Sequence, residues 1–132
     1  MGVDMKQPDQ LLHDELFLIS EGLGCATYPY LPSDSASYPF VVMGEIQTLP
    51  RATKSRLIGR LSSTVHVWGR VDDRKQLSDM VGQLLSSYFA IKNIDGMHFS
   101  AEVNESSIDS NRDNSTDEEL YHFIIYLFYK FY

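Results

Sequence analysis

YPFVVMGEIQTLPRATKSRLIGRLSSTVHVW, residues 38–68, is the stretch that decides the fold. Its first part, Tyr38 to Thr48, is rich in aromatic and β-branched residues and ends before Pro50, which cannot donate a hydrogen bond to a neighbouring strand. Its last part, from about Arg60 to Trp68, alternates between two sets of side chains, the pattern of a half-buried strand. The stretch therefore predicts two strands with one face turned towards a core.

A basic loop is expected between these strands, from Leu49 to about Gly59. This loop is longer than the roughly two to five residues that a hairpin turn needs. It carries Arg51, Lys54 and Arg56, with Arg60 just beyond, in a chain whose formal net charge is −7. It is either an ordinary solvated loop or a contact for an acidic protein surface or for the phosphates of DNA.

Periodicity and turn residues predict the remaining elements. We expect helices at about Asp9 to Glu21 and from Asp72 or Asp73 to Phe89, and further strands at Cys25 to Tyr30, Met97 to Val103 and Leu120 to Tyr132. The order helix, strand, strand, strand, helix, strand, strand predicts one α+β domain over residues 1–132, with a mainly antiparallel sheet and two helices packed on one face. The polar segment at about 105–119 is expected to be a flexible connection.

The last expected strand carries bulky apolar side chains on both faces. Phe123, Ile125 and Leu127 lie on one face, and Ile124, Tyr126 and Phe128 lie on the other. If the helices cover one face only, the second face is an apolar patch of the kind that marks an interaction surface. Trp68 is expected either at such an interface or beneath the amino-terminal helix.

Composition excludes several classes of protein. A net charge of −7 argues against a general nucleic-acid binder, so any contact with DNA must be local. The single cysteine, Cys25, cannot form an internal disulfide and fits a reducing cytoplasm. There is neither a secretory leader nor an apolar run of membrane-spanning length, so we expect a soluble protein that does not contact membranes.

The sequence contains no recognisable catalytic or cofactor motif, and we expect no enzyme and no cofactor. His66, His98 and His122 all lie on expected strands, where Glu45 or Glu102 could join them in a metal site. Half-exposed or hydrogen-bonded strand histidines are the more ordinary interpretation, so no metal site is predicted.

One family resemblance covers most of the chain, from Tyr28 to Tyr132. YPYLP (28–32), YPFVVMGE (38–45), a Thr/Lys/Arg loop, STVHVW (63–68) and LYHFIIYLFYKFY (120–132) occur in this order. This ordered set resembles the tail-terminator or tail-to-head joining proteins of bacteriophages with long non-contractile tails, a family of siphophage minor tail proteins. The resemblance is strongest to phages of Gram-positive hosts.

The resemblance implies a structural virion protein that is made late and assembled in the host cytoplasm. Such a protein forms a ring, by analogy a homohexamer, at the head-proximal end of the tail, where it ends polymerisation of the tail tube. Its partners would be the tail-tube protein and the head completion or connector protein, with transient contact to DNA in the lumen. In solution we expect a monomer or weak oligomer.

The residues expected to make these contacts come from the basic loop and from the second face of the sheet. They are Arg51, Lys54, Arg56, Arg60, Trp68, Ile124, Tyr126 and Phe128. The alternative is a small α+β ligand-binding module or enzyme, unrelated to virion assembly, with a pocket between sheet and helices.

Overall fold

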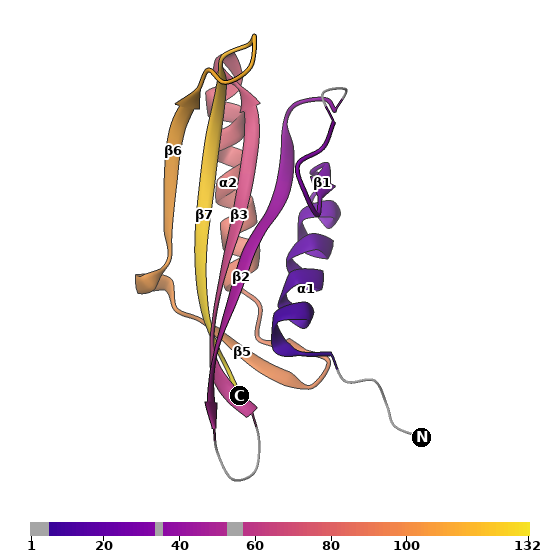
Figure 1. Cartoon of the computed structure of the whole chain (residues 1–132), viewed down its shortest axis with the longest axis vertical. Coiled ribbons are helices and arrows are strands. Elements are labelled where there is room, and N and C mark those ends of the chain that lie inside the picture. Colours follow the sequence, from indigo (N-terminus) through magenta and orange to yellow (C-terminus); the bar gives the residue numbers. More distant parts are fainter. Residues whose placement is uncertain (1–5, 34–35, 53–56) are drawn as a thin grey trace.

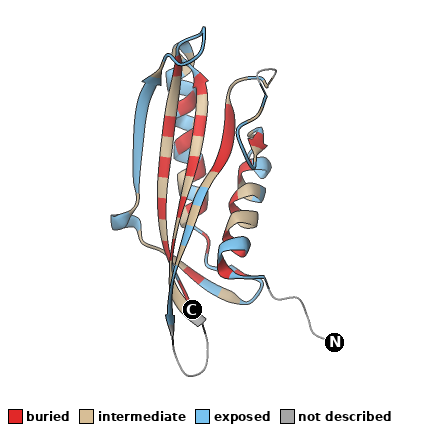
Figure 2. Cartoon of the chain, viewed as in Figure 1, coloured by how far each residue is buried: buried red, intermediate tan, exposed pale blue. Residues whose placement is uncertain are grey.

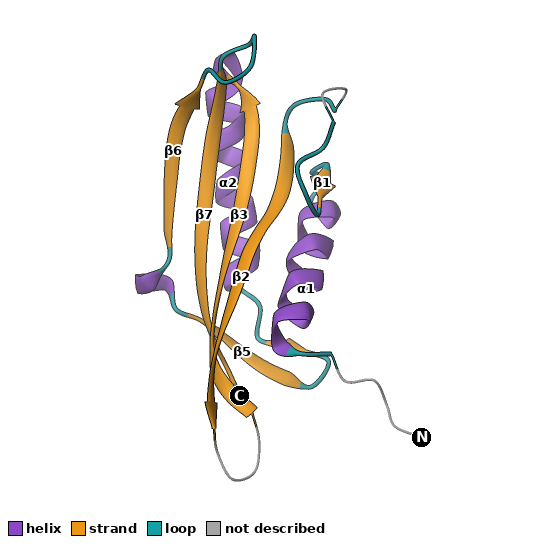
Figure 3. Cartoon of the chain, viewed as in Figure 1, coloured by secondary structure: helices purple, strands orange, loops and turns teal. Residues whose placement is uncertain are grey.

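A computed structural model describes residues 6–33, 36–52 and 57–132 of the chain, and for Ala52 and Leu57 the backbone alone. The helices are α1 (Pro8–Gly22), η1 (Val71–Asp73), α2 (Arg74–Phe89) and η2 (Val103–Glu105), of which η1 and η2 are short 3-10 turns. The strands are β1 (Thr27–Tyr28), β2 (Phe40–Ala52), β3 (Leu57–Arg70), β4 (Asn93–Ile94), β5 (Met97–Ala101), β6 (Ser107–Asp113) and β7 (Leu120–Phe131). Figures 1 and 3 show two α-helices packed along long strands, which confirms the α+β class.

The strands of the described residues form one curled sheet in the order β1-β2-β3-β7-β5-β4. Only the short β1–β2 pair is parallel, and the other pairs are antiparallel, as the sequence predicts. β5 pairs with one end of β7, at Tyr129 to Phe131, while β6 pairs with the other end, at Leu120 to Tyr126. β7 is therefore enclosed by strands on both sides along most of its length.

The predicted basic loop from Leu49 to Gly59 is wrong in its extent. β2 and β3 continue as a paired hairpin through Leu49↔Arg60 and Arg51↔Ile58, so that only residues 53–56, which lie outside the described part, remain between them. Pro50 does not end the strand, because β1 pairs with β2 only at Val41 and Val42 and leaves the edge of β2 open further along.

The predicted flexible connection at 105–119 is also wrong, because half of it is β6. Ser107 to Asp113 pair with Tyr126 to Leu120 in continuous register. Nearly all of β6 is exposed, and Figure 1 shows it as the outer strand beside β7. Its backbone hydrogen bonds stabilise the strand without any need for an apolar face, which is why side-chain pattern alone did not reveal it. Polar side chains suit such an edge.

The core lies between the helices and one face of the sheet, which we call the first face. Val65 and Ile125 from the sheet and Leu12, Leu16 and Leu84 from the helices are fully buried in one cluster. The cluster to which they belong holds most of the buried apolar side chains among the described residues, and their burial stabilises the fold. The helices therefore pack on one face, as predicted.

A buried polar chain links both helices to β7 within this core. The Ser20 hydroxyl donates to the Leu16 carbonyl at 2.8 Å and lies 2.6 Å from the Tyr88 hydroxyl, which must then be the donor between them. The Tyr129 hydroxyl donates to the Tyr88 carbonyl at 2.7 Å. Because each of these hydroxyl groups has a hydrogen-bond partner, the core avoids the free-energy cost of burying an unpaired polar group.

A β-bulge at Gly44 and Glu45 shapes the second face of the sheet, opposite the helices. Met43 pairs with Val65 and Ile46 with Ser63, so Gly44 and Glu45 together oppose one residue of β3. A Cβ atom on Gly44 would lie 2.6 Å from the Thr64 carbonyl oxygen and 2.9 Å from His66 Nε2. Glycine is therefore required by the close approach of β3.

Gly44→Ala should lower the free energy of unfolding by about 1–3 kcal/mol, because backbone and the His66 ring must shift to accommodate the methyl group. Gly82→Ala is the matched control. Position 82 is an exposed position of helix α2 where a Cβ meets nothing within 4 Å, and alanine favours a helix more than glycine does. It should leave stability unchanged or raise it by up to about 1 kcal/mol. Urea denaturation of both variants measures the difference, and equal midpoints would contradict the close-approach argument.

Candidate interaction site on the second face of the sheet

The second face of the sheet is built mainly by alternate residues of β3 and β7. These are Ser62, Thr64, His66 and Trp68 from β3, and His122, Ile124, Tyr126 and Phe128 from β7. All eight side chains are half-buried, whereas their first-face neighbours Val65, Val67, Ile125 and Leu127 are fully buried. Figure 2 shows this alternation as red and tan bands along β7. The apolar second face predicted from the sequence is therefore present.

Three stacked rings, Trp68, His122 and His66, lie at one end of this face. The Trp68 and His122 rings are nearly parallel, with centroids 3.8 Å apart and an angle of 9° between planes. His66 Nδ1 lies 2.7 Å from His122 Nε2, a hydrogen bond in which one imidazole donates and the other accepts. The pair therefore needs at least one neutral ring.

Burial keeps both imidazoles uncharged near neutral pH. Burial, and after it the neighbouring His66, lower the pKa of His122 to about 4. Burial also lowers the pKa of His66, while the nearby Glu45 carboxylate opposes that shift. At neutral pH the site thus presents neutral aromatic rings.

A hollow of about 600 Å³ opens beside the rings. Its floor includes Trp68, Ile124 and Tyr126, and one wall is Pro29 to Leu31, from the segment that follows β1. Tyr30 is 75% exposed and Leu31 64% exposed, which is unusual for such large apolar side chains.

Carboxylates surround this hollow. Glu45 lines it directly. Asp109 pairs with Ile124 across the β6–β7 ladder and so shares the second face, and Asp113 acts on His122 by favouring its protonated form. Among the described residues that line the hollow, none is Lys or Arg. The site therefore combines aromatic surface with negative charge.

The structure brings together part of the residue set that the sequence predicts for interaction. Trp68, Ile124 and Tyr126 meet in the hollow, and Phe128 continues the same face towards the end of the hairpin. The alternative placement of Trp68 beneath the amino-terminal helix is wrong, because strand alternation turns Trp68 away from the helices.

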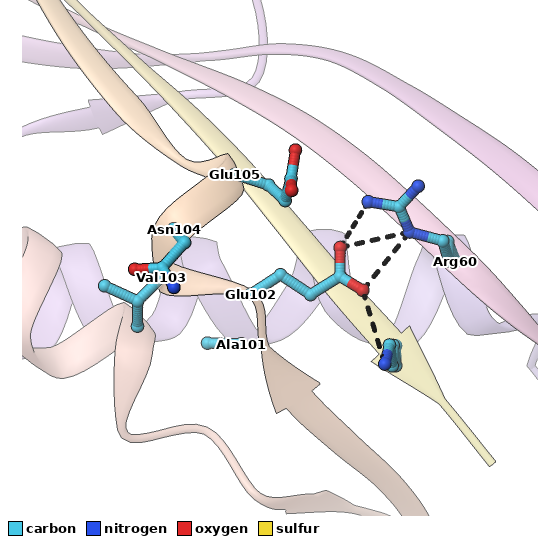
Figure 4. Close-up of a pocket in the computed structure, with 7 residues that line it drawn as sticks. Arg60, Ala101, Glu102, Val103, Asn104 and Glu105 are labelled. Carbon is cyan, nitrogen blue, oxygen red and sulfur yellow. Dashed lines mark hydrogen bonds and ion pairs between the residues drawn. The ribbon is translucent and has the colours of Figure 1, made fainter.

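The basic residues of the predicted set lie apart from the hollow. Arg51 is exposed on β2 near the end of the hairpin, and Lys54 and Arg56 lie outside the described residues. Arg60 is engaged within the chain: its Nε lies 3.0 Å from Glu102 Oε2, its Nη2 bonds the same carboxylate, and its guanidinium lies over the Phe128 ring. Figure 4 shows this contact, to which Lys130 adds an ion pair at 3.9 Å. Arg60 is therefore not a free positive charge.

Sequence reasoning missed several residues of the site. Tyr30 ends an expected strand and Leu31 follows it, and Asp109 and Asp113 belong to the segment expected to be flexible. Of the three histidines that the expected strands could bring together, His66 and His122 meet, whereas His98 stacks on Tyr132. In residues 6–33, 36–52 and 57–132, no three His, Cys, Asp or Glu residues are grouped to hold a metal ion. In the same ranges, no helix has the length and apolar character needed to cross a membrane.

Comparison with known proteins identifies the fold but no family. No protein-family model matches the sequence, and no curated protein matches it. Among solved structures, the fold is similar to a chain of the virion of native gene transfer agent (GTA) particle, with a TM-score of 0.57 and 10% sequence identity. The alignment covers 86% of this chain and 84% of that chain. At this identity the similarity is one of fold.

The histidine pair should make stability depend on pH. Histidine in an unfolded chain titrates near pH 6.5, whereas His122 binds its proton only near pH 4 in the folded state, so stability is lost as pH falls from about 6.5 to about 4. His122→Phe keeps a stacking ring without a titrating group, and its urea midpoint should fall less over this range. His98→Phe, outside the hollow, should retain the wild-type fall. Equal pH dependence in wild type and His122→Phe would contradict the assignment.

Proposed function

We propose that this chain is a structural protein of a phage-like virion and, more narrowly, a tail terminator. In this role it forms a ring at the head-proximal end of the tail, ends tube polymerisation and joins the tail to the head connector. The observation that carries the proposal is the second face, where Trp68, Ile124 and Tyr126 form apolar surface that no helix covers in the described chain. Its fold similarity to a chain of a gene transfer agent virion supports the same class.

The sheet also offers the asymmetry that a ring needs. β2 beyond Val42 and the outer side of β6 are open edges on opposite sides of one sheet. Different surfaces on two sides of a subunit allow head-to-tail contacts, which close into a ring when the rotation between neighbours closes. A structural role of this kind requires no catalytic group and no cofactor. By family analogy the ring is a hexamer.

The proposed partners follow from where the ring sits. One side would contact the tail-tube protein and the other the head completion or connector protein, with Arg51 suited to an acidic protein surface. In solution we expect a monomer or weak oligomer. The second face is only half-buried, and ordering identical subunits costs free energy that a tail tip, acting as a template, offsets.

Particles made without this protein should show the defect directly. Electron microscopy of lysates should reveal tails of irregular, extended length and filled heads without tails, because neither tube growth nor joining is controlled. Supplying the wild-type chain in trans should restore joined particles. If tails lacking the protein keep normal length and still join heads, the tail-terminator proposal is wrong, and a normal particle yield would also remove the wider virion proposal.

A further inference from the structure

We propose that the hollow on the second face receives the basic arm of a second copy of this chain. The basic arm is defined as residues 49–60, the end of the β2–β3 hairpin. This inference rests on the proposed function, because it names the subunit contact from which a ring would be built. Three features carry it: the chemistry of the hollow, the composition of the arm and the distance between them.

The hollow is suited to a cation with an apolar neighbour. The rings of Trp68 and Tyr126 attract a guanidinium or ammonium group through their negative faces. The chain already uses this contact, since Arg60 lies 5.7 Å from the Phe128 ring centre and Arg74 lies 5.4 Å from that of Tyr121.

The charged groups around the hollow favour the same occupant. Glu45 from β2 lines the hollow, and Asp109 and Asp113 from β6 place two further carboxylates on the same face of the sheet. The histidines in its lining are His66 from β3 and His122 from β7, and burial keeps both neutral near pH 7, so neither repels a cation. A basic side chain would therefore enter an electronegative aromatic site.

The basic arm matches this site in composition. Residues 49–60 contain four basic residues and no acidic one, in a chain with 18 acidic residues. Arg51 is exposed, and the neighbouring Leu49 is 49% exposed, so a cation and an apolar side chain occur together at the end of the hairpin. Because Arg60 is held by Glu102, Arg51 is the described residue that can reach outward.

The arm cannot reach the hollow of its own chain. Arg51 pairs with Ile58 of β3, which lies six residues before Thr64 and eight before His66 in the hollow, so about 20–26 Å separate them at the rise of an extended strand. Figure 1 shows the hairpin end projecting at the bottom of the molecule, away from the upper part of β6. An arm that fills the hollow must therefore come from another copy, and such a contact joins two different surfaces, as a ring or filament requires.

Trp68 reports occupancy of the hollow, because it is the only tryptophan of the chain. In the test, an Arg51→Glu chain at low concentration serves as the reporter, since it keeps Trp68 and has a weakened arm. A full-length Trp68→Phe chain, silent in tryptophan fluorescence, serves as the donor of arms. Trp68→Tyr replaces it if Trp68→Phe does not fold.

Increasing donor should shift the Trp68 emission of the reporter until it saturates, and added salt should weaken the apparent affinity because it screens the ion pairs. A donor that also carries Arg51→Glu should bind about tenfold more weakly. A donor that carries Lys92→Glu, the same charge change at another exposed site, should bind like the intact donor.

An absence of any saturable shift, or equal binding by all three donors, would overturn the proposal. A shift on addition of purified tails but not of donor would also overturn it, because the occupant would then be another virion protein. None of these three results would affect the proposed virion role, which is tested separately by particles made without the protein.

Discussion

β7 carries large apolar side chains on both faces, and the arrangement of the other elements depends on this one constraint. Phe123, Ile125, Leu127 and Tyr129 are buried beneath the helices on the first face. No comparable layer from the described part of the chain covers the second face, so Ile124, Tyr126 and Phe128 stay half-exposed. A sheet with one covered face usually alternates apolar and polar residues, and the departure from that rule in β7 concentrates unburied apolar surface in one place. In the described chain, the helices therefore cover one face of β7 and leave the other partly exposed to solvent.

Several devices limit the exposure of the second face without covering it. The Trp68 and His122 rings stack on one another, and the segment of Tyr30 and Leu31 folds along the margin. The bulge at Gly44 brings β2 close to His66 and places Glu45 beside the hollow. β6 then adds a polar, acidic border to the same face. The result is a bounded apolar site with acidic residues beside it, rather than an extended flat apolar surface that would promote aggregation.

The sequence predicted the parts of this fold that depend on hydrophobic periodicity. The α2 stripe of Leu77, Val81, Leu84 and Tyr88 is buried, and the two-faced character of β7 could be read directly from its alternating residues. Both errors of extent have one cause. The end of the hairpin and β6 are each stabilised by backbone pairing to the neighbouring strand in the chain, so their side chains need carry no apolar pattern.

The site was predicted in part for the same reason. The alternation pattern identified Trp68, Ile124 and Tyr126 as large side chains on the outward face of expected strands. Tyr30, Asp109 and the hydrogen bond between His66 and His122 depend on the register between strands and on the path of a loop. No local pattern carries that information. The internal pairing of Arg60 with Glu102, just beyond the end of β5, is likewise a long-range contact, and it engages one predicted interaction residue within the chain.

The second face is open in the free chain, and we propose that it is covered in the particle. Hydroxyl-radical footprinting with mass spectrometry measures it directly, by comparing oxidation of Trp68 and Tyr126 in the free chain and in purified particles. Exposed Tyr132, on the last residue of the chain and outside the hollow, serves as the internal reference. We predict strong labelling of Trp68 and Tyr126 in the free chain and clear protection in particles, relative to Tyr132. Equal labelling of both residues in the two states would contradict the account.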